Sequence, residues 1–228
     1  MKLCLGLMAT NEETMLSRFL PDLSKAFDGE VVAINYGSTD GTKKILDENC
    51  KFVKTMEWPR NFGQAKTNVI KLAEESDYEW MFFIDADETV KSEDIQIIKD
   101  CIESNTYEMY FMPRIHFRSD NVIEGHLDRF PDMQARLFRL NMGFYYQNVR
   151  HCSLYRESKP LTCWEEKEGP VIPVFIRHYK MAEPKESQML DEVKRLAMDF
   201  GFPEVTKIEI SGSLDKSFEP WVSVKIKI

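Results

Sequence analysis

The stretch Trp80-Met81-Phe82-Phe83-Ile84-Asp85-Ala86-Asp87-Glu88 places five apolar residues directly before three carboxylates. A short, continuous apolar run indicates a strand that is buried on both faces of a sheet. The carboxylates then lie at the carboxyl end of the strand, which is where open α/β sheets bind ligands. Two carboxylates one residue apart can hold a hard divalent cation, which in turn holds a phosphate. An acidic turn after a core strand is the alternative, and this stretch alone does not decide between the two.

Strand and helix patterns alternate through the first hundred residues or so. We expect further strands at residues 3–8, 31–35 and 52–53. Between them the apolar spacing predicts helices, one with Asn11 as its N-cap, one after Gly41-Thr42 and one from Asn61 to about Glu75. A fourth helix is expected after Ser92-Glu93-Asp94. This alternation predicts βαβ units and a parallel sheet.

The second half of the sequence has a different pattern. Aromatic residues interleaved with Arg and His predict strands at residues 107–117, 135–140 and 144–149. Residues 118–131 are polar and contain Gly and Pro, which predicts a surface loop long enough to be functional. A helix is expected at residues 183–200, followed by a hairpin built from residues 207–210 and 221–228.

Composition limits the class of protein. The 228 residues suggest one domain with at most a small appendage, and the net charge of −8 argues against general electrostatic affinity for nucleic acid or anionic membranes. Five scattered cysteines without a C-x-x-C pair indicate reduced thiols in a cytosolic protein. The sequence shows neither a signal peptide nor a transmembrane run, so we expect a soluble, cytoplasmic protein, with peripheral attachment to a membrane left open.

Four short motifs follow the expected strands in order and point to a known family. They are Asn11-Glu12-Glu13, Gly37-Ser38-Thr39-Asp40-Gly41-Thr42, Asn61-Phe62-Gly63-Gln64-Ala65-Lys66 and Phe83-Ile84-Asp85-Ala86-Asp87-Glu88. Together they resemble the nucleotide-sugar-binding half of glycosyltransferase family 2, which has the GT-A fold. The segment Phe130-Pro131-Asp132-Met133-Gln134-Ala135-Arg136-Leu137-Phe138-Arg139 resembles one branch of that family, which includes bacterial lipopolysaccharide-core glucosyltransferases. The resemblance covers roughly residues 2–200.

The resemblance implies a metal site that binds the diphosphate of the donor. Asp87 would ligate Mg²⁺ or Mn²⁺, and Asp85 would lie near the ribose or the same metal. His178 would be a third metal ligand or a diphosphate contact, although a hydrogen-bonded structural histidine is an equally good interpretation. Glu88 is expected to be a solvated or capping acid rather than a ligand.

The donor loops follow from the same resemblance. Thr10, Asn11 and Glu12 would contact the base or ribose, with a simple helix cap as the alternative for Asn11. Asn35 and Tyr36 stand where the family usually has Asp, which leaves the base open, with uridine as the default. The resemblance also places Lys66 facing the diphosphate, and an exposed helix lysine is the alternative.

Asp132 is the candidate general base. Inverting transfer needs a carboxylate that takes the proton from the acceptor hydroxyl while the anomeric carbon is attacked from the face opposite the diphosphate. Arg136 would orient Asp132 or pair with phosphate, and Asp128 and Glu124 are reserve candidates for the base. A surface aspartate in a turn is the alternative. His151 would line the acceptor site, although Cys152 replaces the acid that the branch carries next to it.

We therefore expect an α/β protein with the GT-A fold, a Rossmann-like mixed sheet flanked by helices. Residues 1–180 would be the catalytic domain, with a nucleotide-sugar half (1–105) and an acceptor half (106–180), and residues 181–228 a helix and hairpin extension. The expected function is metal-dependent, inverting transfer of a sugar from a nucleoside-diphosphate sugar. The acceptor would be a glycan, a lipid-linked glycan, a peptide or a modified nucleic acid. A sugar-phosphate nucleotidyltransferase and a non-catalytic nucleotide- or glycan-binding domain are the alternatives.

Overall fold

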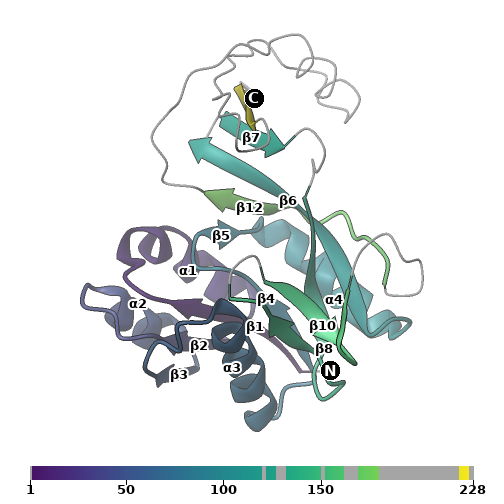
Figure 1. Ribbon diagram of the computed structural model, residues 1–228, viewed down its shortest axis with the longest axis horizontal. Helices are drawn as coiled ribbons and strands as arrows, with labels where there is room; N and C mark the ends of the chain where they lie inside the picture. The colour runs from purple at the N-terminus through teal and green to yellow at the C-terminus, as the bar shows by residue number, and fades with distance from the viewer. Residues whose placement is uncertain are drawn as a thin grey trace. The chain divides into compact units, whose positions relative to one another are not determined.

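The computed structural model describes residues 2–119, 122–126, 132–149, 152–161, 169–179 and 221–225 (Figure 1). The chain forms two compact units. The first unit comprises residues 1–113 and 134–175, and the second comprises residues 114–133 and 176–228. Strands β6 (Met109–Ser119) and β8 (Asp132–Arg139) contribute residues to both units.

The first unit is built on a mixed sheet with the order β6-β8-β4-β1-β2-β3. The four parallel strands are β1 (Leu3–Ala9), β2 (Val31–Asn35), β3 (Phe52–Thr55) and β4 (Trp80–Phe83). Strand β8 runs antiparallel to β4, with Leu137 opposite Phe82. The structure therefore confirms the predicted α/β class with a mixed sheet.

Helices connect the parallel strands as the apolar spacing predicts. These helices are α1 (Glu13–Ala26), α2 (Thr42–Asn49), α3 (Phe62–Glu75) and α4 (Ile95–Ser104). A two-residue strand, β5 (Glu88–Thr89), and a 3₁₀ turn, η1 (Ser92–Asp94), lie between β4 and α4. Helix α3 begins after Asn61 because the Asn61 side chain accepts a hydrogen bond from the Gln64 N–H at 3.0 Å.

One predicted helix start is wrong in detail and another is confirmed. Asn11 is not the N-cap of α1: it has a left-handed backbone (φ 54°), and Glu12 is the residue at the cap position. Helix α4 starts at Ile95, directly after Ser92-Glu93-Asp94 as predicted, although residues 92–94 themselves form the 3₁₀ turn. In the first case the Asn11 side chain has another partner in the neighbouring loop, described below.

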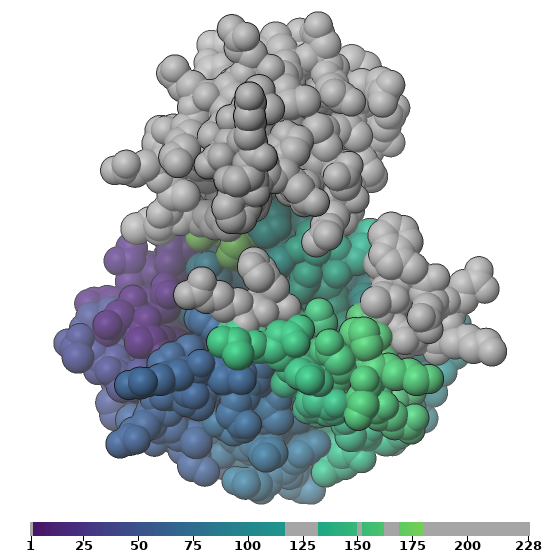
Figure 2. Space-filling view, in the orientation of Figure 1, coloured from purple at the N-terminus to yellow at the C-terminus, as the bar shows by residue number. Residues whose placement is uncertain are grey.

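A small antiparallel sheet packs against α3. It consists of β9 (Tyr145–Gln147), β10 (Ser153–Arg156) and β11 (Lys159–Pro160). The Thr67 hydroxyl donates to the Tyr146 carbonyl at 3.1 Å, and the Tyr146 N–H donates back to it at 2.9 Å. Figure 2 shows the corresponding blue and green segments side by side. This packing brings residues from the second half of the chain onto α3, which belongs to the first hundred residues.

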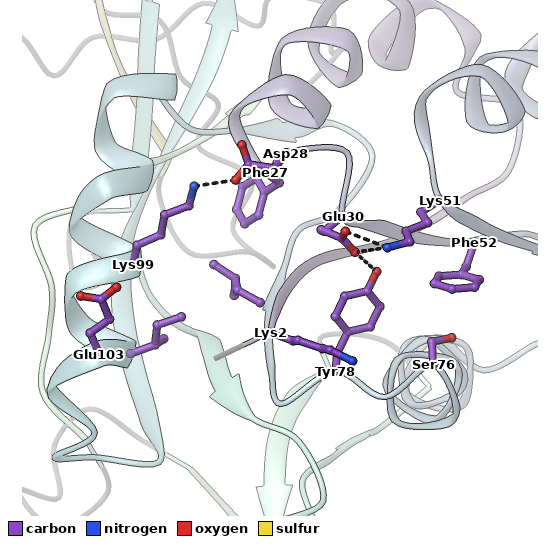
Figure 3. Close-up of a pocket in the computed structure, with 12 residues that line it drawn as sticks. Lys2, Phe27, Asp28, Glu30, Lys51, Phe52, Ser76, Tyr78, Lys99 and Glu103 are labelled. Carbon is purple, nitrogen blue, oxygen red and sulfur yellow. Dashed lines mark hydrogen bonds and ion pairs between the residues drawn. The ribbon is translucent and has the colours of Figure 1, made fainter.

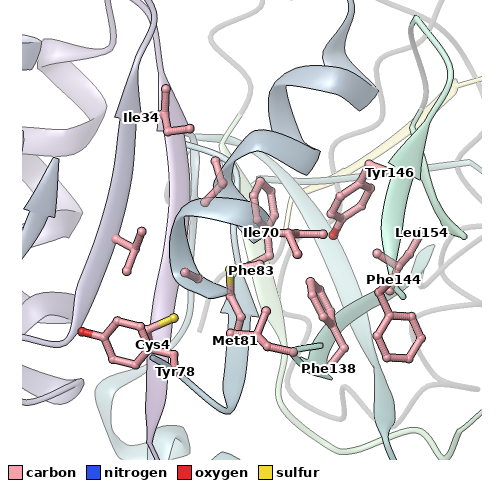
Figure 4. Close-up of a cluster of buried hydrophobic side chains, with 14 of the residues drawn as sticks. Cys4, Ile34, Ile70, Tyr78, Met81, Phe83, Phe138, Phe144, Tyr146 and Leu154 are labelled. Atoms are coloured by element: carbon pink, nitrogen blue, oxygen red, sulfur yellow. The ribbon is translucent and has the colours of Figure 1, made fainter. Parts of the chain in front are cut away.

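The two faces of the main sheet bury different side chains. On one face, Met81 and Phe83 join a cluster with Val69 of α3 and Phe138 of β8 (Figure 4). On the other face, Phe82 stacks on Phe27 at the end of α1, with ring centroids 5.9 Å apart. Successive residues of a strand point to opposite faces, so the continuous apolar run of β4 is needed to fill both cores.

The described part of the second unit consists of strands. Strand β12 (Ile176–Tyr179) runs parallel to β6, β7 (Val122–His126) runs antiparallel to β6, and β13 (Trp221–Lys225) runs antiparallel to β7. The prediction of a loop at residues 118–131 is therefore wrong for residues 122–126. Short strands with polar residues pair through the backbone, which a hydropathy pattern does not report. The expected helix at residues 183–200 and strand at 207–210 lie outside the described residues.

Among the helices that the model describes, none is both long enough and apolar enough to cross a membrane.

We expect Gly63→Ala to destabilise the contact between α3 and the small sheet. A Cβ at Gly63 would lie 2.9 Å from the carbonyl oxygen of Asn148, which is backbone and has little freedom to move. Such overpacking should lower the free energy of unfolding by about 1–3 kcal/mol. Chemical denaturation followed by circular dichroism measures this, with Lys71→Ala on the exposed side of α3 as the control, expected within about 0.5 kcal/mol of wild type. Equal stability of both variants would contradict the contact.

Candidate functional site

Three loops meet at the carboxyl ends of the parallel strands. The loop after β1 begins next to the loop after β2, because the Tyr36 N–H donates to the Ala9 carbonyl at 2.9 Å. The end of β4 joins the same edge through the Ile84 N–H, which donates to the Gly6 carbonyl at 3.0 Å. The structure thus brings the predicted donor loops and the Asp85-x-Asp87 turn to one edge of the sheet, as strand topology requires.

The first two loops are joined by hydrogen bonds from side chains. The Asn11 side-chain oxygen accepts the Thr39 N–H at 2.8 Å, and the Glu12 N–H donates to the Thr42 hydroxyl at 2.7 Å. The Thr10 hydroxyl donates to the Tyr36 carbonyl at 3.3 Å. Asn11 therefore links the two loops, which explains why it does not cap α1. Contacts of Thr10, Asn11 and Glu12 with a donor remain predictions.

Asn35 and Tyr36, which replace the usual acids, both have structural partners. The buried Asn35 side-chain oxygen accepts the Ser38 N–H at 3.2 Å. The Tyr36 hydroxyl donates to the Ala65 carbonyl at 3.0 Å and accepts from the Asn68 amide at 3.1 Å. Asn35 thus keeps its two amide N–H groups and one further lone pair of its oxygen for any further partner.

Asp85 forms a buried ion-pair cluster with two cations. The Lys66 ammonium lies 2.6 Å from Asp85 Oδ1, and Arg136 Nη2 lies 2.8 Å from Asp85 Oδ2. Lys66 is only 8% exposed and Arg136 only 1%, so the expectation of an exposed helix lysine is excluded. The aromatic rings of Phe83 and Tyr146 also lie within 5.4 Å of the Lys66 ammonium.

The two cations keep Asp85 ionised. Burial by itself raises the pKa of Asp85, but the attraction of Lys66 and Arg136 outweighs burial and holds that pKa well below its usual range. Burial likewise lowers the pKa of Lys66, which Asp85 opposes. Asp85 is therefore a fixed negative group that accepts hydrogen bonds, and it is unsuited to exchange protons near neutral pH.

Glu88 is not the solvated acid that the sequence suggested. It is 1% exposed, and its Oε1 lies 2.8 Å from Arg136 Nη2. Arg136 consequently pairs with Asp85 and Glu88, which corrects the expectation that it orients Asp132 or pairs with phosphate. In the sequence, Glu88 is recognisable only as an acid three residues after Asp85. Its partner Arg136 lies on β8, 48 residues further along the chain, so the pairing is not visible there.

Asp87 is half-buried at the same turn, and two further carboxylates stand nearby. Burial raises the pKa of Glu12, and the negative charges of Asp87 and Asp40 raise it further. No group of three or more metal-binding side chains is arranged as a protein cage within the described residues. This arrangement fits a Mg²⁺- or Mn²⁺-type ion that takes one or two carboxylates and completes its shell with phosphate oxygens and water.

Asp132 and His178 belong to the second unit. Arg114 Nε donates to Asp132 Oδ2 at 3.0 Å, and His116 Nε2 lies 3.7 Å from the same oxygen. The Nδ1 atoms of His116 and His178 share a hydrogen bond of 2.6 Å, so only Nε2 of His178 could bind a metal while this bond is kept. His151 and the reserve acid Asp128 lie outside the described residues, and Glu124 falls on β7.

A cavity of about 380 Å³ lies at the opposite, amino-terminal edge of the sheet (Figure 3). Four of its charged groups pair with one another: Lys51 with Glu30 at 2.7 Å, and Lys99 with Asp28 at 2.9 Å. The Tyr78 hydroxyl also donates to Glu30. Because these groups satisfy each other, the cavity lacks the convergent polar groups of a ligand site.

Comparison with known proteins identifies the family to which the chain belongs. The family model described as glycosyl transferase family 2 matches residues 5–159. The chain therefore belongs to glycosyl transferase family 2, as the four motifs predicted, and it has the GT-A fold.

Two known proteins illustrate the similarity. The chain is 28% identical over 143 residues to the SPbeta prophage-derived glycosyltransferase SunS of Bacillus subtilis (strain 168), a match that covers 60% of this chain but only 31% of SunS. The chain thus spans about a third of the length of this curated relative. The structure of S. aureus TarS 1-349 in complex with UDP-GlcNAc aligns with a TM-score of 0.54 and 14% identity, covering 80% of this chain and 60% of that chain.

We expect Asp85→Asn to change how stability depends on pH. The pKa of Asp85 is depressed in the folded chain, so the carboxylate stabilises the fold above its unfolded pKa of about 3.9 and loses this contribution as the pH falls. The difference in unfolding free energy between wild type and Asp85→Asn should be largest near neutral pH and shrink below about pH 4.

Urea unfolding at a series of pH values measures this difference. Asp22→Asn, an exposed position on α1, serves as the matched control and should track wild type at every pH. A difference for Asp85→Asn that stays constant as the solution is acidified would show that the carboxylate is not held ionised by its cations.

Proposed function

We propose that this chain transfers a sugar from a nucleoside-diphosphate sugar to a nucleophile on an acceptor. The observation that carries the proposal is the Asp85-x-Asp87 turn at the carboxyl end of β4, with Lys66 and Arg136 fixed on Asp85. Membership of glycosyl transferase family 2 supports the same reaction class. The segment from Phe130 to Arg139 supports placement in the branch that includes lipopolysaccharide-core glucosyltransferases.

The donor is proposed to be a UDP-sugar in the first instance. The aligned S. aureus TarS structure holds UDP-GlcNAc, which makes UDP-sugars the first donors to test. Asn35 would meet the base or ribose through its amide group, whose oxygen also accepts the Ser38 N–H. Thr10, Asn11 and Glu12 are proposed to form the other wall of this donor pocket.

A Mg²⁺ or Mn²⁺ ion is proposed to be held by Asp87, with the donor diphosphate as its other anionic ligand. Such an ion would stabilise the negative charge that develops on the leaving diphosphate. Asp85 keeps its charge balanced by Lys66 and Arg136, so its proposed role is to accept a hydrogen bond from the donor. His178 remains a proposed third ligand through its Nε2.

Asp132 is proposed as the general base for inverting transfer. Arg114 fixes the orientation of its carboxylate, with two guanidinium nitrogens directed at Oδ2. The oriented carboxylate would take the proton of the acceptor hydroxyl.

We also propose functional regions along the chain. Residues 1–180 would be the catalytic domain, with the donor bound by residues 1–105 and the acceptor by residues 106–180, and residues 181–228 would be an extension. The acceptor is proposed to be a glycan, a lipid-linked glycan, a peptide or a modified nucleic acid. A cytoplasmic location, with peripheral attachment to a membrane left open, is proposed; the scattered cysteines without a C-x-x-C pair support it.

Asp87→Asn should abolish donor turnover while leaving the fold intact. With UDP-, GDP- and dTDP-sugars and Mn²⁺, wild type should slowly release nucleoside diphosphate, and the variant should do so at least about 100-fold more slowly, because the amide lacks the charge that holds the cation. Asp22→Asn is the matched control and should retain the wild-type rate. Full activity of Asp87→Asn, or of wild type in excess chelator, would contradict the metal site.

Asp132→Asn should separate donor binding from transfer. We expect it to bind UDP and Mn²⁺ with wild-type affinity in calorimetry, since the first unit is unchanged, while the rate of turnover falls by about 100- to 10,000-fold. Undiminished turnover would remove Asp132 as the base and move the test to Glu124 and Asp128.

A further inference from the structure

Glu88 closes the turn that carries Asp85 and Asp87 with two hydrogen bonds, one from its backbone and one to its side chain. The Glu88 N–H donates to the Asp85 carbonyl at 2.9 Å, and the Asp85 N–H donates back to Glu88 Oε2 at 2.9 Å. Asp87 lies inside this closed turn. The direction in which the turn leaves β4 is therefore set by a side chain that is itself buried.

Arg136 connects the same two acids through one atom. Its Nη2 donates to Asp85 Oδ2 at 2.8 Å and to Glu88 Oε1 at 2.8 Å. An Nη2 group has two hydrogens, so each carboxylate receives one. Arg136 stands on β8, the antiparallel neighbour of β4, so the bridge also ties the turn to a second strand.

Glu88 and Arg136 are both about 1% exposed, so a donor molecule would reach Asp85 and Asp87 without touching either of them. With Lys66 and the partly exposed Asp85 they make a group of two cations and two anions, whose charges balance.

Burying the charged side chain of Arg136 costs free energy of desolvation. Its Nε and Nη1 are buried and have no hydrogen-bond acceptor within the described residues. A well-packed apolar residue in place of a buried ion-pair partner is often neutral or stabilising when both partners are exchanged. The guanidinium of Arg136 is therefore held by the two carboxylates of the turn, those of Asp85 and Glu88.

We propose that Glu88 and Arg136 are positioning residues for the donor site, which fix the orientation of Asp85 and the placement of Asp87 without contacting the donor. The proposal rests on the proposed function of the Asp85-x-Asp87 turn.

Glu88→Gln is the first test. Its amide has a single acceptor oxygen, so it can keep the bond from the Asp85 N–H or the bond from Arg136, but not both. Release of nucleoside diphosphate by the folded variant should have a kcat about 100-fold below wild type, because a displacement of about 1 Å at a reacting site has this effect. The KM for the donor should change much less.

Glu108→Gln is the matched control. Glu108 also pairs with an arginine, Arg156, but both side chains are partly exposed and lie away from the turn. Its kcat and KM should equal those of wild type. An unchanged kcat in Glu88→Gln would overturn the proposal.

Arg136→Met tests the second positioning residue. The folded variant should show the same split as Glu88→Gln, with kcat about 100-fold below wild type and a KM for the donor that changes much less. A residue that serves only the stability of the fold would leave the kcat of the folded molecules unchanged.

The outcomes separate this proposal from the proposed function. A wild-type chain that releases nucleoside diphosphate from none of the donors would refute the proposed function and, with it, this proposal. An active wild type together with an unchanged kcat in Arg136→Met overturns positioning alone. So does loss of folding in both Glu88→Gln and Arg136→Met, because the two residues would then serve the fold alone.

Discussion

The ion pair between the partly exposed Asp85 carboxylate and its two buried cations is the interaction on which the candidate site depends. Removing one partner of a buried pair typically costs about 3–5 kcal/mol, since the remaining charge is left without compensation. Three parts of the chain meet at this point: Lys66 comes from α3, Asp85 from the end of β4 and Arg136 from β8. Correct placement of the aspartate turn therefore requires the helix and both strands to be in register.

The fold could be predicted from the sequence because it follows from local periodicity. The apolar run of β4 and the apolar face of α3 can each be recognised within about fifteen residues. Asn61 also marks the start of α3 correctly. Errors occurred where a side chain has a partner in a different loop: Asn11 resembles a helix cap by type and position, but Thr39 occupies its oxygen.

The sequence predicted the motif residues of the candidate site, but not which charges neutralise one another there. Asp85, Asp87 and Lys66 follow from the order of motifs, and the structure brings these three to one edge. The burial of Glu88 could not be seen, because it depends on Arg136 arriving from a strand 48 residues later. Spacing along a chain states which residues are local neighbours, and it carries no information about which distant charge will neutralise them.

The placement of β8 between β4 and β6 has a consequence for synthesis of the chain. Until residues 134–139 have been made, β4 has β1 on one side and an unpaired edge on the other. That edge exposes Trp80-Met81-Phe82-Phe83, an uncharged, aromatic-rich segment of the kind that pairs with other chains. A nascent or truncated chain that ends before β8 would thus expose a strand edge that can pair with other chains. Pairing of β8 with β4 covers this edge, and it also places Arg136 next to Asp85.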